Sequence, residues 1–230
     1  MYISLLVYGR AGSGKSILAS TFPKPLIIDA DSSHRVYQES KAFPEAVYVQ
    51  GDNCIPALQK AIEQVKNKTN KFETIVIDSL TALENIAVSA LKGFSSEKWE
   101  ASLYSSRGRK LGYDEWGAVS GSSIAILTEL RKYPINVVIV TQMATVSDNG
   151  SEKYYPELIG KGQNESLHFS DIVGFMETTE GGRFLHLSSS TTDRFVAKAR
   201  SLGGDLLPIK NPNYTKLLDS LSSPTLNLQF

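Results

Sequence analysis

A glycine-rich segment near the N-terminus has the residue types and spacing of a phosphate-binding loop. It reads Gly9-Arg10-Ala11-Gly12-Ser13-Gly14-Lys15-Ser16 and fits the pattern G-x-x-x-x-G-K-[ST]. Glycines let successive backbone N–H groups turn inward around an anion. We expect Lys15 to reach the β- and γ-phosphates and the Ser16 hydroxyl to hold Mg²⁺. An apolar run (residues 3–8) precedes the loop and a helical stretch (16–22) follows it, so the sequence predicts binding of a nucleoside triphosphate.

A second candidate for metal binding is the acid that ends another apolar run. The segment reads Thr74-Ile75-Val76-Ile77-Asp78-Ser79, which is the form of a Walker B strand. An Asp at the carboxyl end of such a strand lies beside the phosphate-binding loop and can hold Mg²⁺, directly or through water. The alternative is that Asp78 or Ser79 caps the helix that follows.

The elements that position these residues alternate between strand and helix through residue 140. Strand signals cover residues 26–29, 46–50, 74–79 and 135–140, and helical spacing covers 55–68, 81–91 and 114–132. Strand signals then follow one another at 172–177, 183–188 and 194–199, before a short helix at 214–221. This order predicts an α/β fold with a mostly parallel central sheet, helices on both faces and added antiparallel strands. We expect one domain over residues 1–221 and a tail over 222–230.

Composition narrows the classes of partner. The 230 residues carry 24 basic and 24 acidic side chains, so any contact with nucleic acid must come from local patches. The only cysteine is Cys54, which excludes an intrachain disulfide and a cysteine-based metal cluster. No apolar run approaches the roughly 20 residues of a membrane span, and the N-terminus lacks the pattern of a signal peptide. We therefore expect a cytoplasmic protein without a membrane partner.

Four stretches together resemble the core of the RecA-like recombinases. They are the phosphate-binding loop, Leu26-Ile27-Ile28-Asp29-Ala30-Asp31, the run from Thr74 to Leu83, and Val137-Val138-Ile139-Val140-Thr141-Gln142. A weaker match, Phe195-Val196-Ala197-Lys198-Ala199-Arg200, is similar to the segment whose basic residues reach the neighbouring subunit's ATP site. The resemblance covers about residues 1–200. The short chain and the stretch 155–161 look like a phage-encoded branch of RecA-like single-strand annealing proteins.

This resemblance implies a RecA-like P-loop NTPase that binds ATP and Mg²⁺ and hydrolyses ATP. In that family a carboxylate at the end of the second strand activates the attacking water, and the matching residue here is Asp31. Recombinases usually carry Glu at this position. Because Asp is one methylene shorter and a general base must reach its water, we expect slow hydrolysis. The alternative is that Asp31 caps the next helix or binds Mg²⁺ through water.

Gln142 matches the residue that senses the γ-phosphate in RecA-like proteins. The resemblance implies that it passes the state of the nucleotide to the segment that follows, residues 143–165, by an order–disorder switch. The alternative is a polar strand end that meets solvent.

Lys198 and Arg200 match the cations that act in the neighbouring subunit's ATP site. They alternate with Val196 on an expected strand and so share one face with it. The resemblance implies that they stabilise charge on the transferring phosphoryl group, as an arginine finger does, in a homo-oligomeric ring or filament with ATP at subunit interfaces. The alternative is a solvated strand face.

Two long irregular segments, residues 93–113 and 143–165, match the positions of the RecA DNA-binding loops. Cations that could meet phosphates are Arg107, Arg109, Lys110, Lys153 and Lys161, and aromatic residues that could stack on bases are Trp99, Tyr104, Tyr154 and Tyr155. Proteins that bind single strands without sequence preference combine these two contacts. The alternative is a solvated, serine-rich loop.

The leading hypothesis is an ATP-dependent protein that binds and anneals single-stranded DNA in phage recombination. Its partners would be single-stranded DNA, copies of itself and a single-strand-binding protein. A nucleotide-switched adaptor or loader of a replication or repair complex, without significant turnover, is the second hypothesis. A metabolic kinase is the third, and it is disfavoured because Gln142 and the two long segments fit a recombinase core better.

Overall fold

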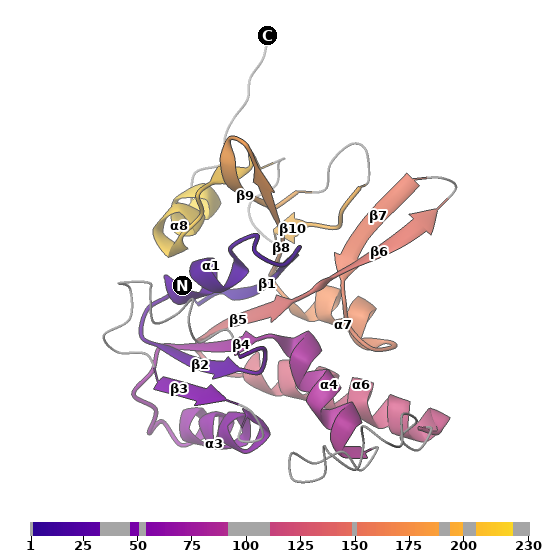
Figure 1. Ribbon diagram of the computed structural model, residues 1–230. Helices are drawn as coiled ribbons and strands as arrows, with labels where there is room; N and C mark the ends of the chain where they lie inside the picture. The colour runs from indigo at the N-terminus through magenta and orange to yellow at the C-terminus, as the bar shows by residue number, and fades with distance from the viewer. Residues whose placement is uncertain are drawn as a thin grey trace.

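The computed structural model describes residues 2–32, 47–50, 54–91, 111–148, 151–188, 194–199 and 206–222. These residues form one large mixed sheet, a separate two-stranded hairpin, and helices on both faces of the sheet (Figure 1). In the described part of the chain no helix is both long and apolar enough to cross a bilayer.

The centre of the sheet is parallel, as the alternating order of strands and helices predicts. Its strands run in the order β3-β2-β4-β5-β1-β8. Their bounds are Ser4–Gly9 for β1, Pro25–Asp29 for β2, Val47–Gln50 for β3, Thr74–Asp78 for β4, Asn136–Thr141 for β5 and Ile172–Thr179 for β8. All residues of β2, β4 and β5 are buried, which explains their continuous apolar runs.

The antiparallel extension begins at β8, which pairs with β9 (Gly182–His186), and β9 pairs with β11 (Ile209–Lys210). The strand expected over 194–199 is largely wrong: only β10 (Lys198–Ala199) pairs with β8. The reason lies in Val196, whose backbone N–H and carbonyl both bond to the Tyr8 hydroxyl, at 2.8 Å each. A backbone engaged by a side chain is not available to a neighbouring strand.

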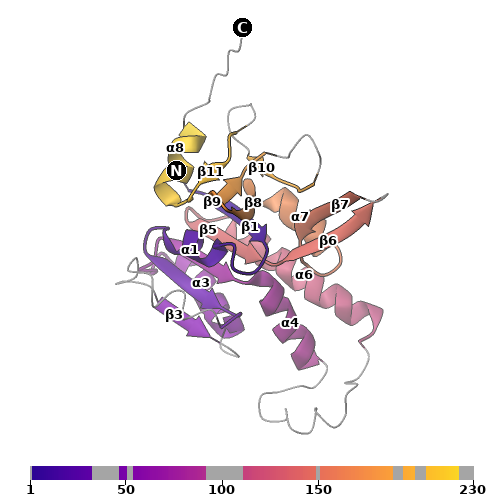
Figure 2. The same cartoon turned by 45° about the horizontal axis from the view of Figure 1, so that its top comes forward.

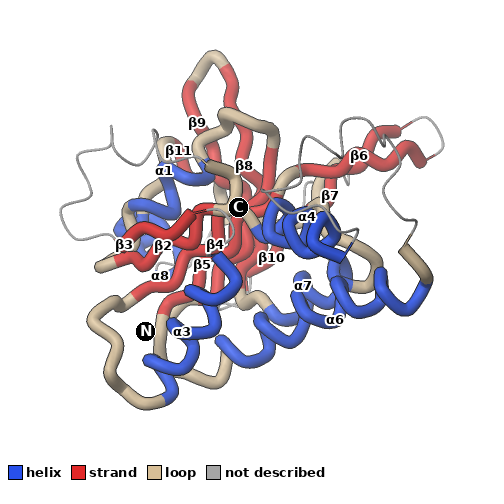
Figure 3. Tube along the Cα trace, turned by 60° about the horizontal axis from the view of Figure 1, so that its bottom comes forward, coloured by secondary structure: helices blue, strands red, loops and turns tan. Residues whose placement is uncertain are grey.

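Helices cover the two faces of the sheet and bury two separate cores. On one face lie α1 (Lys15–Ser20) and α8 (Tyr214–Ser222), packed over apolar residues such as Val7 and Val138. On the other face lie α3 (Cys54–Lys66), α4 (Leu80–Leu91), α6 (Tyr113–Leu130) and α7 (Gly162–Phe169), as Figures 1 and 3 show. The arrangement places every parallel strand's carboxyl end at one edge of the sheet.

The segment 143–165 is not irregular, so this expectation is wrong. It contains the hairpin of β6 (Met143–Asp148) and β7 (Ser151–Pro156), paired antiparallel from Met143–Pro156 to Asp148–Ser151. Helix α7 begins at Gly162 and lies against α6. Figures 1 and 2 show the hairpin projecting beyond the sheet, directly after β5.

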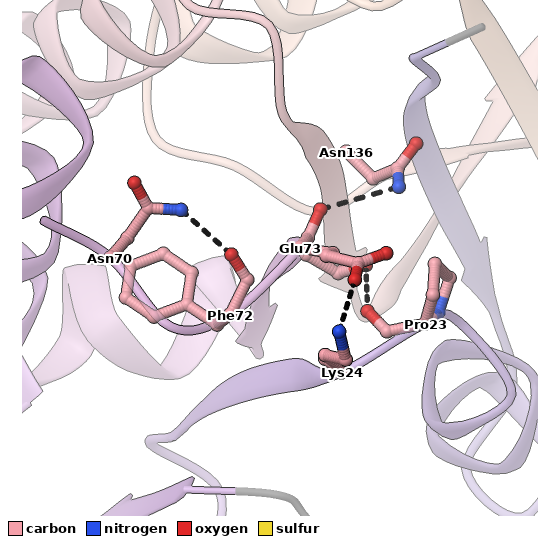
Figure 4. Close-up of polar contacts among 7 residues, drawn as sticks. Pro23, Lys24, Asn70, Phe72, Glu73 and Asn136 are labelled. Atoms are coloured by element: carbon pink, nitrogen blue, oxygen red, sulfur yellow. Dashed lines mark hydrogen bonds and ion pairs between the residues drawn. The ribbon is translucent and has the colours of Figure 1, made fainter. Parts of the chain in front are cut away.

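The opposite edge of the sheet, where the parallel strands begin, is tied by short polar contacts (Figure 4). Thr74 Oγ1 donates to the Pro23 carbonyl at 2.7 Å, and Asn136 Nδ2 donates to the Glu73 carbonyl at 3.3 Å. Lys24 and Glu73 form an ion pair at 2.6 Å, with about half of each side chain exposed. An exposed pair of this kind contributes about 0–1 kcal/mol, so the backbone contacts fix this edge.

Candidate nucleotide-binding site

The phosphate-binding loop follows β1 at the carboxyl edge of the sheet, where its sequence context places it. Gly9 lies opposite Met176 of β8, and a Cβ at this glycine would lie 2.2 Å from the Met176 carbonyl oxygen. Gly14 precedes α1 with φ 97°, a left-handed conformation that side chains other than glycine rarely adopt. Two glycines of the motif are therefore required by the backbone itself.

Lys15 reaches back over the loop. Its Nζ donates to the carbonyl oxygens of Gly9 and Arg10, at 2.9 Å each. Burial lowers the pKa of the Lys15 ammonium, and the nearby carboxylates of Asp78 and Asp31 partly oppose this effect. The charge is thus held in a partly dehydrated position where an anion would stabilise it.

Ser16 and Asp78 lie together, as expected for a pair that shares a metal ion. Ser16 Oγ donates to Asp78 Oδ2 at 2.6 Å. The Asp78 side chain is 1% exposed, and its backbone carbonyl accepts the N–H groups of Ala30 at 2.7 Å and Asp31 at 3.3 Å. The end of β4 therefore also positions Asp31, whose side chain is exposed at the mouth of the site.

A pocket of about 390 Å³ brings the predicted residues into one place. It is lined by Gly9, Arg10, Ala11, Gly12, Lys15, Ser16, Asp31, Asp78, Gln142 and Met143. Four stretches that are far apart in the sequence thus converge on one cavity, and each contributes residues that the sequence predicts for a nucleotide site. Ser13 and Gly14 complete the loop beside it.

The side chains of this pocket fit a nucleoside triphosphate with Mg²⁺. Ser13 is 3% exposed, and its Oγ makes no hydrogen bond within the described part of the chain. The loop's glycines and Lys15 would hold the phosphates, and Ser16 and Asp78 would hold the ion. When bound, Mg²⁺ supplies charge neutralisation at the phosphate oxygens.

A ring of three hydrogen bonds connects this pocket to the base of the hairpin, where β6 begins and β7 ends. The Thr81 hydroxyl, on α4, accepts the Gln142 backbone N–H at 3.0 Å and donates to the Glu157 carbonyl at 2.7 Å. The Glu157 N–H in turn donates to the Gln142 carbonyl at 2.9 Å. Thr81 therefore holds the entry to β6 and the exit from β7 against the helix that follows Asp78.

A second side chain of α4, one turn further on, fixes the same segment. Glu84 is 3% exposed; its Oε2 accepts the Ile159 N–H at 2.8 Å and its Oε1 accepts the Ser123 hydroxyl at 2.7 Å. On α6, Ser120 Oγ accepts the Gly162 N–H at 3.0 Å. Burial raises the pKa of the Glu84 carboxyl, while the bonds from Ser123 and Ile159 oppose this. We call Thr81, Glu84, Ser120 and Ser123 the polar seam.

Aromatic side chains from β7, β8 and the segment 194–199 pack together and anchor the β6–β7 hairpin. Tyr154 of β7 stacks on Phe175 with ring centroids 5.7 Å apart, and Phe175 stacks on Phe195 at 4.7 Å. Arg194 lies over the Tyr154 ring at 5.6 Å. Tyr154 is 6% exposed, so the expectation that it stacks on nucleic-acid bases is wrong for this arrangement.

The remaining predicted residues lie away from the nucleotide pocket or outside the described residues. Lys198 pairs with Val173, near the start of β8, whereas the loop of the same chain contacts Met176 further along that strand. Lys153 lies on β7, and Lys161 is exposed before α7. Arg107, Arg109, Lys110 and Arg200, with Trp99 and Tyr104, lie outside the described residues.

Sequence reasoning missed the polar seam, although a signal for it exists. Thr81 and Glu84 are spaced i, i+3 on an otherwise largely apolar helix, so they share one face. Polar residues on the core face of a helix next to a Walker B strand indicate a buried polar contact. The backbone groups of Glu157 and Ile159 that they contact were not predictable as partners, because both residues belong to a segment expected to be irregular.

Comparison with known proteins adds a family match. Residues 1–201 match the protein family described as AAA domain, a range that includes every residue lining the nucleotide pocket. No curated protein matches the chain. Among solved structures, a KaiC-like protein from the hyperthermophilic archaeon Pyrococcus horikoshii aligns with 13% sequence identity and a TM-score of 0.47, covering 85% of this chain and 82% of that chain.

Proposed function

We propose that this chain, which belongs to the AAA domain family, is a P-loop ATPase of the RecA type that binds and anneals single-stranded DNA in an ATP-dependent manner. In this proposal it serves phage homologous recombination and hydrolyses ATP slowly, stimulated by DNA. The observation that carries the proposal is the β6–β7 hairpin, which begins at the nucleotide pocket and is held there by Thr81.

One face of the hairpin has the chemistry of a single-strand binding surface. Residues paired in register share a face, so Val146 with Lys153 and Ala144 with Tyr155 lie on the face opposite to buried Tyr154. Val146 is 47% exposed. A cation, an aromatic ring and apolar surface on one ribbon suit both phosphate contact and base stacking.

Gln142 supplies the connection between nucleotide and hairpin. Gln142 lines the pocket, and its backbone N–H and carbonyl bond to Thr81 and Glu157. A change in the Gln142 position on γ-phosphate contact would therefore shift both ends of the hairpin relative to α4. This is the element whose equilibrium a nucleotide would bias.

Asp31 and Lys198 take the two hydrolytic roles in this proposal. Asp31 orients and activates the attacking water at the mouth of the pocket. Lys198, together with Arg200, acts in the pocket of a neighbouring subunit, which agrees with the distance along β8 between Lys198 and the loop of its own chain. The functional unit is therefore a homo-oligomer with ATP at subunit interfaces.

Matched single substitutions test the hairpin surface. Binding of a labelled oligonucleotide is measured with a slowly hydrolysed ATP analogue for Lys153→Ala and Tyr155→Ala, beside Lys24→Ala and Tyr2→Ala as controls. Lys24 and Tyr2 lie at the opposite edge of the sheet, where the parallel strands begin, and Tyr2 is 60% exposed just before β1. Loss of one phosphate contact lowers the slope of log affinity against log salt by about 0.7, and loss of one stacked base costs about 1–3 kcal/mol.

The controls and a second assay decide between hypotheses. Equal affinities for the hairpin variants and their controls would contradict the proposed surface. Annealing of complementary strands is then scored with ATP and with ADP, along with phosphate release. Nucleotide-dependent DNA binding without phosphate release or annealing would instead support the adaptor or loader.

A further inference from the structure

The β8–β9 hairpin places an arginine against the phosphate-binding loop. Arg183 of β9 is opposite Thr178 of β8, and Leu185, two residues further on, is fully buried in the core under α1. Since residues i and i+2 of a strand share a face, Arg183 projects from the face that α1 covers. A Cβ at Gly14 would lie 2.7 Å from Arg183 Cδ, 3.0 Å from its Nε and 3.4 Å from its Cζ. The guanidinium therefore runs past the loop at Gly14.

The backbone of Arg183 is fixed by the next strand. The Arg183 carbonyl accepts the Asn211 N–H at 2.7 Å, and the Arg183 N–H donates to Asn211 Oδ1 at 3.3 Å. Lys216 Nζ in turn donates to the carbonyls of Lys210 and Asn211, at 2.9 and 3.1 Å. Asn211, which bonds to the backbone of Arg183, is thus itself held by Lys216. This favours a defined position for the Arg183 side chain.

The guanidinium of Arg183 has no partner of its own in the described residues, where no hydrogen bond or ion pair is formed by its end groups. It is half-buried. A half-buried guanidinium usually pairs with an acid or packs in a bidentate contact, because dehydrating a charge costs free energy. Here the group it lies beside is the backbone of a phosphate-binding loop.

We propose that Arg183 contacts the α- and β-phosphates of the bound nucleotide, from the side of the loop opposite to the catalytic residues. Asp31, Asp78 and Gln142 line the nucleotide pocket, on the side where we expect the γ-phosphate, and Arg183 and Gly14 lie outside that lining. The loop's backbone cradles the α- and β-phosphates, and Gly14 is part of that backbone. Arg183 is thus a binding residue for nucleoside di- and triphosphates. The inference rests on nucleotide binding at the loop and is independent of DNA.

Calorimetric titration of the purified chain, without DNA, tests the assignment. The probes are ATP, ADP and inorganic tripolyphosphate, each with Mg²⁺, and the variants are Arg183→Gln and Arg183→Lys. Arg183→Gln keeps much of the side-chain stem and removes the charge, whereas Arg183→Lys keeps the charge. Lys210→Ala is the matched control, since Lys210 lies on the adjacent strand with its Nζ 6.0 Å from the Phe184 ring.

We expect Arg183→Gln to weaken binding of all three probes about tenfold, which corresponds to about 1.4 kcal/mol. Arg183→Lys should recover part of this loss, and Lys210→Ala should bind as the unmodified chain does. Affinities within twofold of the unmodified chain for Arg183→Gln would overturn the assignment. A loss for ATP alone would place the contact at the γ-phosphate, and a loss for both nucleotides but not for tripolyphosphate would place it at the nucleoside; either result also overturns it.

The design separates this inference from the proposed function. Failure of DNA binding or annealing leaves the titrations unaffected, because no DNA is present. Thermal unfolding of each variant, followed by circular dichroism, shows whether the fold is retained. If Arg183→Gln is unfolded, the comparison of Arg183→Lys with Lys210→Ala decides, since a planar guanidinium contact is not replaced in full by an ammonium.

Discussion

Thr81 and Gln142 are joined side chain to backbone: the Thr81 hydroxyl accepts the Gln142 N–H at 3.0 Å while it donates to the Glu157 carbonyl. Thr81→Val keeps the shape of the side chain and removes both bonds. We expect ATP affinity within about twofold of the unmodified chain and a loss of about 1–3 kcal/mol in unfolding free energy, because two backbone groups lose their partner. Hydrogen exchange of residues 143–156 should no longer differ between an ATP analogue and ADP.

Thr81→Ser restores the hydroxyl and serves as the positive control for this prediction. Thr128→Val is the matched negative control, because Thr128 is exposed on α6 and its hydroxyl bonds only within that helix. The contradicting result would be hydrogen exchange of the hairpin in Thr81→Val that responds to the nucleotide as it does in the unmodified chain. That result would show that Thr81 does not connect the nucleotide pocket to the hairpin.

Much of the nucleotide site was predictable because its residues lie at the ends of buried parallel strands. Gly9, Asp78 and Gln142 each follow an apolar run, and parallel strands bring their carboxyl ends to one edge. The residues of the nucleotide site can therefore be identified from the apolar run that precedes each of them. The closing contacts of the site are different: the strand signals at 172–177 and 183–188 and the turn between them predict the pairing of β8 with β9, but they do not show that this pairing brings Arg183 to Gly14.

The β6–β7 hairpin was not predicted, because its strands are polar on one side and contain few β-branched apolar residues. A signal was nevertheless present: Asn149-Gly150 lies between the two strands, and Asn-Gly is a strong hairpin turn sequence. The reverse error occurred at 194–199, where a strand-like sequence is held by the Tyr8 hydroxyl, forms one isolated bridge between Phe195 and Tyr154, and pairs with β8 over two residues only.

Lys15 should make stability depend on pH in the alkaline range. Its folded-state pKa is below its ordinary value of 10.5 because of burial, so between these two values the unfolded chain binds more protons than the folded one. Stability should therefore rise with pH across that window. Urea unfolding at several pH values, compared with Lys15→Met, isolates this contribution.

Lys15→Met should bind no measurable ATP and should lack this rise in stability. A parallel pH profile in the two proteins would contradict the assignment of a dehydrated ammonium to Lys15.

Glu84 should have the opposite effect in the acidic range. Burial raises the pKa of its carboxyl above 4.5, so between 4.5 and the raised value the folded chain binds more protons than the unfolded one. Stability should fall as pH rises through that window. Glu84→Gln keeps hydrogen-bonding groups for Ser123 and Ile159 and should remove this dependence, while Glu84→Ala should lose about 1–3 kcal/mol by leaving the Ile159 N–H unpaired.

Unfolding of the three proteins by urea from pH 4 to 8 measures these differences. If the unfolding free energy of Glu84→Gln still decreased as pH rises through this window, another group would be the cause of the decrease.

Asp31 should affect turnover without affecting nucleotide affinity. General-base catalysis contributes about 10²–10⁴-fold, so Asp31→Ala should lower steady-state phosphate release by about 100-fold or more, with ATP affinity nearly unchanged. Asp31→Glu extends the carboxylate by one methylene and should hydrolyse faster than the unmodified chain. Turnover unchanged in Asp31→Ala would exclude Asp31 as the base.

In our proposal the nucleotide pocket controls a DNA-binding hairpin. The most direct measurement is the affinity of the unmodified chain and of Thr81→Val for one labelled single strand, each with a slowly hydrolysed ATP analogue and with ADP. We predict that the unmodified chain binds at least tenfold more tightly with the analogue, and that this ratio falls to about one in Thr81→Val although the nucleotide still binds. Equal affinities with the analogue and ADP in the unmodified chain would contradict the claim.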